Sequence, residues 1–417
     1  MLLCNAGYYG TLAAIRSLGR SGVAVTTVDP AMLATGRYSR YTSSHLSCPP
    51  FEHTNQFAQW LLRLGKTGPR RVIYATSDAV SLALAAHRDE LSEYFDLYQP
   101  DLPSTMRILD KGQLLEHSRA VGIDTPDTWL PTSRQEAERI IRQVGGTILV
   151  KPRSQLSVRT YTKGAVSGAG QEAVLARYDG IIGLGAHDPE FAKRFPEVVL
   201  PMLQRYHPEA MEAVYSLSGF RDITGKQITM LGARKVLQHP RRLGVGLCFE
   251  EAEVVPEIAV RAALLCERIG YYGAFELEYI MSGGRALLID FNGRFYNQMA
   301  FDIKRGLDLP GLVHAAAVGN NSRVETLVSN VAAHATNIAF CNEFGLTVMI
   351  CMQRMTGAMS KQDAVRWQDW RRAPGRKVVD AVRDPYDRLP ATIDAMQQIY
   401  MGIRHPRSFY RQFGFVS

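Results

Sequence analysis

The chain has 417 residues, of which 46% are hydrophobic and 21% are charged. This length and composition predict a globular protein of two to four lobes and exclude a disordered chain. The net charge of +8 comes from Lys and Arg residues spread along the chain, without the basic tail or aromatic-rich basic patch typical of nucleic-acid binding. We therefore expect no nucleic-acid partner, and we expect some of the excess charge to face anionic small molecules such as phosphates.

Apolar runs and cysteines indicate the cellular compartment. The N-terminal segment is interrupted by Asn5, Gly7, Gly10 and Arg16, so it has neither a signal peptide's apolar stretch nor a membrane-spanning length. The six cysteines include no CxxC pair and no His stands at metal-ligand spacing, which indicates reduced thiols and argues against a zinc site. We therefore expect a cytoplasmic protein without a membrane partner.

The first hundred or so residues alternate between strand and helix patterns. Expected strands lie at residues 1–7, 23–29 and 70–78, and expected helices at residues 10–22 and 54–65. This alternation predicts an α/β domain with an open parallel sheet, which we assign to residues 1–105. Ligands of such sheets lie at the carboxyl ends of the strands. The residues expected at those ends are Asn5, Gly7, Asp29, Ser77 and Asp78.

The pattern changes in the rest of the chain. A helix that leads into the strand GTILVKPR predicts a small α+β lobe at residues 106–208. Several strands joined by tight turns, such as MSGGRA at residues 281–286, predict a larger lobe at residues 209–325. Residues 326–417 are polar and rich in turns before a final helix, and we expect a helical and irregular C-terminal extension.

The run LLIDFNGRF carries Asp290, Asn292 and Arg294 at every second position. In a strand these side chains share one face, and a face with a carboxylate, an amide and a guanidinium is expected to bind a ligand. Glu278 lies twelve residues before Asp290, across the predicted hairpin, so strand pairing brings it beside Asp290 and Asn292. Hard oxygen ligands on adjacent strands suit Mg²⁺, which completes its shell with waters and phosphates.

Lys151 ends the strand GTILVKPR just before Pro152, a position that suits a phosphate. Simpler explanations exist for each residue. A lone Lys after a strand is usually solvated, and the polar side chains of LLIDFNGRF can also belong to the solvated face of an edge strand. The apolar flanks of both strands favour an interior position, where charges need partners or a metal.

The ordered series of motifs resembles the ATP-grasp superfamily, in particular its carboxylate-amine ligase branch, which includes D-aspartate ligases. The matched segments are residues 10–29, 37–50, 110–129, 148–153, 162–166, 232–246, 273–280 and 287–295. The superfamily usually has Glu-x-Asn-Pro-Arg on its metal-binding strand, whereas Asp290 and Gly293 replace the Glu and the Pro here. The resemblance implies an N-terminal parallel βαβ domain followed by a two-lobed α+β ATP-grasp domain.

The resemblance also implies ATP as a cofactor with Mg²⁺ or Mn²⁺. The implied metal ligands are Glu278, Asp290 and Asn292. The implied ATP-binding residues are Lys111, Lys151, Lys163, Gln204 and Glu212. The hinge of the branch usually reads Gln-Glu-Tyr, but Arg205 follows Gln204 here, so Glu212 is expected to take the ribose. The implied catalytic cations are Arg234, Lys235 and Arg294, the last of which would hold an acyl phosphate.

The activity implied by the resemblance is ATP-dependent, ADP-forming ligation of a small-molecule carboxylate to an amine through an acyl phosphate. Phosphoryl transfer activates a carboxylate if the negative oxygens of both partners can be brought together, which metal ions, Lys and Arg allow. The residues expected to select the substrates are Asp78, Asn297 and Gln298. Two glycine-containing stretches, residues 166–170 and 239–246, are candidate lids or simple turns.

Two other functions stay open on the sequence. The stretch NAGYYG, with Asp29 nineteen residues after Gly10, loosely matches the fingerprint of an NAD(P)-binding oxidoreductase, although Asn5 replaces its first glycine. A non-catalytic ATP-binding regulator is the other alternative, because of the altered hinge and Asp290. Residues 326–417 are expected to cover the active site, to form a homodimer or to bind a carrier protein.

Overall fold

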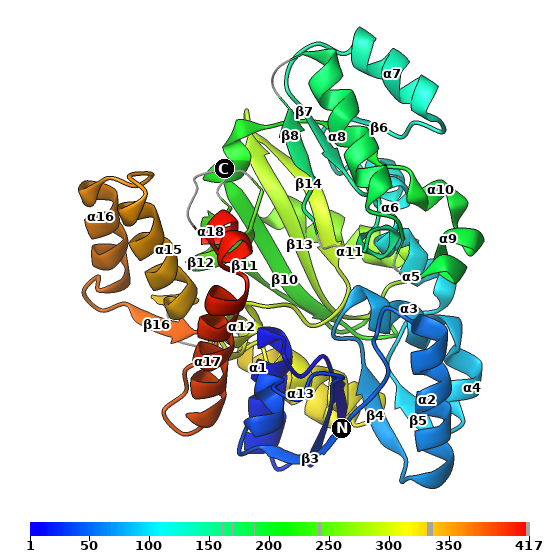
Figure 1. Cartoon of the computed structure of the whole chain (residues 1–417). Coiled ribbons are helices and arrows are strands. Elements are labelled where there is room, and N and C mark those ends of the chain that lie inside the picture. Colours follow the sequence, from blue (N-terminus) through cyan, green and yellow to red (C-terminus); the bar gives the residue numbers. More distant parts are fainter. Residues whose placement is uncertain (160–161, 168–169, 187, 241–242, 332–336, 414–417) are drawn as a thin grey trace.

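The computed structural model describes residues 1–159, 162–167, 170–186, 188–240, 243–331 and 337–413. The chain folds around three sheets, one in each of three consecutive regions (Figure 1). The first is parallel and the other two are antiparallel or mixed. The predicted fold class, a parallel α/β domain followed by two α+β lobes, is confirmed.

The N-terminal domain contains a five-stranded parallel sheet with the strand order β3-β2-β1-β4-β5. Its strands are β1 (Leu2–Cys4), β2 (Val25–Val28), β3 (Thr42–Leu46), β4 (Arg71–Tyr74) and β5 (Phe95–Leu97). Its helices are α1 (Tyr9–Arg20), α2 (Thr54–Thr67), α3 (Asp78–Ala86) and α4 (Arg88–Ser92). Helix α3 starts directly after β4, where the Ser77 hydroxyl accepts a hydrogen bond from the Val80 amide. This start places Ser77 and Asp78 at the carboxyl edge of the sheet.

The second region forms a small lobe around a four-stranded sheet with the order β6-β9-β7-β8. The strands are β6 (Thr128–Trp129), β7 (Ile148–Lys151), β8 (Ala165–Ser167) and β9 (Met202–Arg205). The helices are α5 (Leu102–Leu109), α6 (Lys111–Ala120), α7 (Arg134–Gln143), α8 (Gln171–Gly183), α9 (Pro189–Arg194) and α10 (Pro196–Val199). Alternate residues of β7, Ile148 and Val150, are buried with Ile141 of α7 and Tyr178 of α8, so these two helices cover one face of the sheet.

The third region contains a seven-stranded sheet with the order β14-β13-β10-β11-β12-β15-β16 at the centre of the molecule (Figure 1). Its strands are β10 (Val214–Arg221), β11 (Ile228–His239), β12 (Val245–Ala252), β13 (Gly273–Ser282), β14 (Arg285–Asn292), β15 (Ile338–Cys341) and β16 (Lys377–Asp380). Helix α11 (Pro256–Ile269) packs its apolar face on the sheet through Leu265 and Ile269. The predicted β13–β14 hairpin is present, and its turn uses Gly283 and Gly284, whose φ angles are +55° and +76°.

The C-terminal segment is more regular than its sequence indicated. It adds β15 and β16 to the edge of the central sheet, and its helices are α15 (Glu343–Met355), α16 (Lys361–Arg371), α17 (Leu389–Arg404) and α18 (Pro406–Phe413). Before it, the helices are α12 (Met299–Lys304), α13 (Leu309–Ala317) and α14 (Asn321–Asn330). Asp394 of α17 accepts a hydrogen bond from Tyr9, and Asp387 pairs with Arg16 of α1. These contacts hold the segment against the N-terminal domain.

In the part of the chain that the structure describes, no helix combines the length and the hydrophobicity that crossing a bilayer would require.

Candidate active site

Two cavities adjoin each other between the three regions. The larger cavity, of about 380 Å³, lies between the carboxyl edge of the N-terminal sheet and the end of β14. The smaller cavity, of about 90 Å³, lies between the sheet of the small lobe and the central sheet. Both cavities are lined by Lys111, Gln155, Lys163 and Asp290. A ligand in one cavity would therefore face a ligand in the other across these four side chains.

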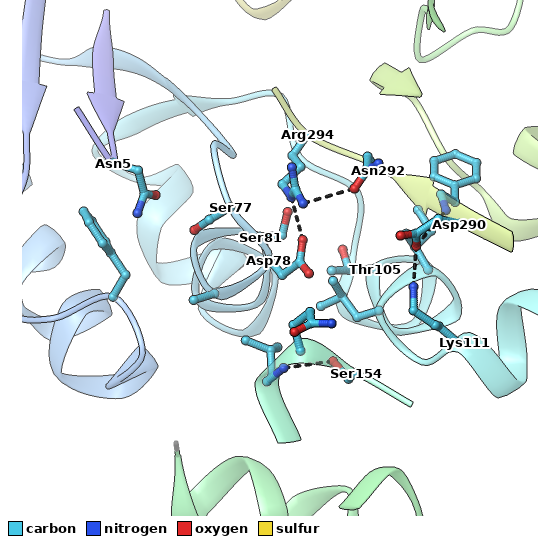
Figure 2. Close-up of a pocket in the computed structure, with 18 of the residues that line it drawn as sticks. Asn5, Ser77, Asp78, Ser81, Thr105, Lys111, Ser154, Asp290, Asn292 and Arg294 are labelled. Carbon is cyan, nitrogen blue, oxygen red and sulfur yellow. Dashed lines mark hydrogen bonds and ion pairs between the residues drawn. The ribbon is translucent and has the colours of Figure 1, made fainter. Parts of the chain in front are cut away.

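The β13–β14 pairing brings the predicted polar groups together. Glu278 lies directly opposite Asp290, and Glu276 lies directly opposite Asn292. All four side chains are on one face of the sheet, because each pair is two residues from the next along its strand. Figure 2 shows Asp290 and Asn292 on β14, with Arg294 after them, at the wall of the larger cavity.

Lysines lie around the carboxylates of Asp290 and Glu278. Lys111, the first residue of α6, pairs with Asp290, and the Nζ atom of Lys163 is 3.7 Å from the Oδ2 atom of Asp290. Lys235 of β11 pairs with Glu278. Burial alone would raise the pKa of Asp290, but Lys111 and Lys163 outweigh it, and that pKa lies well below its usual value. Lys235 has the same effect on Glu278, whose pKa is lowered in spite of its burial.

Lys151 closes β7 and is buried in the wall of the smaller cavity. Burial lowers the pKa of its ammonium group to about 7, and the neighbouring charge of Lys111 adds to this effect. The group is therefore easily charged by an arriving anion. Gly164 lets the backbone after β7 pass close to Lys151. A Cβ atom on Gly164 would lie 2.4 Å from the carbonyl oxygen of Val150, so a larger residue would not fit there.

Arg294 connects β14 to the N-terminal domain. Its Nε atom is 2.6 Å from the Oδ1 atom of Asp78, the first residue of α3 (Figure 2). Its Nη2 atom donates to the Oδ1 atom of Asn292 at 3.0 Å, and its Nη1 atom donates to the Phe295 carbonyl at 3.1 Å. Asp78, expected to select substrates, is thus the ion-pair partner of Arg294 in a shared cavity wall.

Glu276 also belongs to this site, although no motif of the sequence predicted it as a site residue. It is 2% exposed and accepts hydrogen bonds from Ser216, Asn292 and Gln298. Burial and the nearby Glu278 raise its pKa to about 7. The signal in the sequence was the alternation in GAFELEYI, which puts Glu276 and Glu278 on one face of β13.

The structure separates Arg234 from Lys235. The two residues follow each other on β11, so their side chains point to opposite faces of the sheet. Lys235 faces Glu278, whereas Arg234 pairs with Glu250 and lines a different hollow, with Glu212 and two tryptophans. Arg234 and Glu212 therefore lie outside the two adjoining cavities.

Of the remaining predicted residues, Gly7, Asp29 and Gln298 line neither of the two cavities. Gln204 is buried in the smaller cavity, next to Arg205, and donates to the Thr128 hydroxyl at 2.8 Å. Asn297 lines the larger cavity. Gln298 is turned away, toward Glu276. Parts of the two candidate lids, residues 168–169 and 241–242, lie outside the described residues.

Comparisons with known proteins identify the fold. No family model matches the chain, and no curated protein matches it either. The structure is similar to the biotin carboxylase domain of the 2-oxoglutarate carboxylase from Hydrogenobacter thermophilus in complex with MgADP, ADP and bicarbonate. The TM-score is 0.59 and the sequence identity 15%, over 76% of this chain and 69% of that chain. The chain has the ATP-grasp fold.

Two further structures with the ATP-grasp fold are similar to the chain. Biotin carboxylase from Campylobacter jejuni has a TM-score of 0.58 and 12% identity, over 76% of this chain and 70% of that chain. N5-carboxyaminoimidazole ribonucleotide synthetase from Thermus thermophilus has a TM-score of 0.54 and 16% identity, over 76% of this chain and 78% of that chain. None of the three is a D-aspartate ligase, so that branch stays a prediction.

Proposed function

We propose that the protein is an ATP-dependent ligase that activates a carboxylate as an acyl phosphate and joins it to an amine, with release of ADP and phosphate. The shared wall of the two cavities carries this proposal. A nucleotide in the smaller cavity and a carboxylate in the larger cavity would meet at Lys111, Lys163 and Asp290. Positioned lysines at that meeting point would offset the repulsion between the phosphate and carboxylate oxygens.

The smaller cavity supplies groups suited to a nucleoside triphosphate. Lys151, Lys111 and Lys163 converge on it, and we assign them to the phosphate oxygens. Gln204 and Arg205 lie at its edge on β9 and are assigned to the base and the ribose. The biotin carboxylase domain from H. thermophilus was determined with MgADP, which is consistent with such a ligand for this fold.

The donor set fits a divalent cation that arrives with the nucleotide. Among the described residues, no group of three or more His, Cys, Asp or Glu side chains could hold a metal by itself. Mg²⁺ in phosphate sites takes only one or two carboxylates and completes its shell with phosphate oxygens and waters. Glu278 and Asp290, with the amide oxygen of Asn292, match this need and would hold Mg²⁺ or Mn²⁺. The bound cation would neutralise charge on the phosphates.

The larger cavity is suited to small substrates. Its volume of about 380 Å³ is near the lower end of small-molecule sites. Arg294 has N–H groups beyond those used by Asp78, Asn292 and Phe295, and we assign it to the carboxylate and then to the acyl phosphate. We expect amino acids or other small carboxylates, and a small amine, as substrates.

Two observations disfavour the oxidoreductase alternative. A Cβ atom at Gly10 would lie 2.3 Å from the carbonyl oxygen of Tyr296, so the start of α1 is covered where a dinucleotide would need room. The carboxylate of Asp29, expected to bind a ribose, accepts instead from the amides of Gly7 at 3.2 Å and Ala31 at 2.8 Å.

The proposal is tested by incubating the purified protein with ATP, Mg²⁺ and a panel of amino acids and other carboxylates, alone and in pairs with amines. We expect ADP and phosphate only with a particular carboxylate and amine. Release of AMP and pyrophosphate would contradict the acyl phosphate and indicate an acyl-adenylate intermediate instead. Tight ATP binding without turnover across the panel would favour the regulator alternative.

A further inference from the structure

Glu276 is a buried carboxylate without a cationic partner. Only 2% of its surface is exposed, and within the described ranges no Lys, Arg or His forms an ion pair with it. Its strand neighbour Glu278, in contrast, pairs with Lys235. Burying an unpaired carboxylate costs free energy that an apolar side chain at the same place would not cost. Such a residue needs an explanation beyond packing.

Three side-chain donors converge on this carboxylate from three different elements. The Ser216 hydroxyl of β10 donates to its Oε1 atom at 2.6 Å, and the Gln298 amide, just before α12, donates to the same oxygen. The Nδ2 atom of Asn292 on β14 donates to its Oε2 atom at 3.0 Å. Glu276 therefore ties the end of β14 to the start of α12, on either side of Arg294.

Asn292 is held between the carboxyl group of Glu276 and the guanidinium of Arg294. Its Nδ2 atom donates to the Oε2 atom of Glu276 at 3.0 Å, so the nitrogen of the amide faces Glu276. The guanidinium of Arg294 has no acceptor, so Asn292 must turn its Oδ1 atom to the Nη2 atom, 3.0 Å away. Only one of the two orientations of the amide satisfies both neighbours. In that orientation the oxygen, with a second lone pair, faces the side of Arg294.

We propose that Glu276 is a positioning residue that fixes the Asn292 amide with its oxygen directed to the reaction centre. The proposal rests on the proposed function, because it takes Asn292 as a ligand of the nucleotide-bound cation. Groups that orient metal ligands in this way commonly change metal affinity by about 10- to 100-fold when they are removed.

Three substitutions of Glu276 separate this role from the alternatives. Glu276→Met fills the space but offers no acceptor to Asn292. Glu276→Asp keeps the charge but draws the oxygens back by one methylene. Glu276→Gln keeps the length of the side chain and one oxygen, which can still accept from Asn292. Its NH₂ group then takes the place of the other oxygen, and the Ser216 hydroxyl and the Gln298 amide can both reorient to accept from it.

The measurement is the Mg²⁺ concentration that gives half-maximal binding of a non-hydrolysable ATP analogue, with the thermal unfolding midpoint of each variant as the control for folding. We expect this concentration to rise about 10-fold or more in the Met and Asp variants, and to stay within about twofold in the Gln variant. If the Met variant does not fold, the comparison of Asp with Gln decides. We also expect Glu276→Met to have no further effect in an Asn292→Ala background.

Four results would overturn the proposal. Equal values in all folded variants, a loss in Gln but not in Asp, or a Met effect that persists in the Asn292→Ala background would each show that Glu276 does not act through Asn292. These results leave the proposed function standing, because the wild-type protein still binds the analogue with Mg²⁺. Absence of Mg²⁺-dependent binding by the wild-type protein would instead overturn both.

Discussion

Arg294 and Asp78 form an ion pair that joins the end of β14 to the first residue of α3, with 2.6 Å between the Nε and Oδ1 atoms. The two residues are 216 positions apart in the chain, and both line the larger cavity. Because Arg294 also holds Asn292, the pair connects the N-terminal domain to the proposed metal site. A substrate bound against the N-terminal domain would thus affect the position of Arg294 and Asn292 at the reaction centre.

Replacing Asp78 by Asn should weaken carboxylate binding. The substitution keeps the size of the side chain but removes the charge that orients Arg294. We expect the KM of the carboxylate substrate to rise about 10-fold, the effect of losing one charge-assisted hydrogen bond, with a smaller change in the KM of ATP. Asp124→Asn is the matched control, because Asp124 pairs with Arg285 on the surface. A larger change in the KM of ATP than of the carboxylate would contradict this assignment.

Replacing Asp290 by Asn should nearly abolish turnover that depends on Mg²⁺. The amide cannot supply the charge that a divalent cation requires, and we expect a loss of roughly 100-fold in kcat/KM. The fold should be kept, as circular dichroism would show. Asp179→Asn, which changes an exposed ion pair with Arg134, should leave activity unchanged. Normal activity of the Asp290 variant would remove the metal assignment.

Binding of ATP should be coupled to proton uptake by Lys151. The pKa of this lysine is about 7 in the free protein, so above that pH most of the molecules carry a neutral amine. Phosphate oxygens favour the charged form and raise the pKa, so binding at about pH 8 should take up close to one proton, and less at about pH 6. Titration calorimetry in buffers of different ionisation enthalpy measures this uptake.

Lys151→Arg is the control for the proton uptake, because a guanidinium stays charged at these pH values. The variant should bind ATP without the dependence on buffer. Equal heats in all buffers for the wild-type protein at about pH 8 would contradict the role of Lys151 at the phosphates.

Asp394 should make the stability of the protein depend on pH. Burial raises the pKa of its carboxyl group to about 6, above the value near 4 of an unfolded chain. The folded state then holds a proton that the unfolded state has lost, so this contribution to stability is present below about pH 4 and is lost as the pH rises through about 6. Asp394→Asn should remove this decline, which urea unfolding at several pH values would detect. Parallel pH profiles for the two proteins would contradict it.

The strand pairing at the site followed from the sequence, whereas several of its contacts did not. The alternation of Asp290, Asn292 and Arg294, with two glycines in the turn, was sufficient to place Glu278 opposite Asp290. The ends of β1 and β4 were likewise expected at a ligand, and Asn5, Ser77 and Asp78 line the larger cavity. These features depend on local period and turn chemistry.

The contacts that the sequence did not predict join residues far apart in the chain. The pair of Asp78 with Arg294 depends on how the N-terminal domain packs on the central sheet, which no local pattern encodes. The same is true of β15. Its four residues are too few to show a periodic pattern in the sequence, and they become a strand by pairing with β12. Arg234 is different, because the alternation along β11 already set it on the opposite face from Lys235.

The acyl phosphate is the central claim, and transfer of oxygen from the carboxylate tests it most directly. Once the substrate panel has named the carboxylate, it can be labelled with ¹⁸O and the phosphate released during turnover can be examined by ³¹P NMR. The account predicts that each phosphate carries one ¹⁸O from the carboxylate, because the acyl phosphate breaks between carbon and oxygen when the amine attacks. Phosphate without ¹⁸O, or label found in AMP, would contradict it.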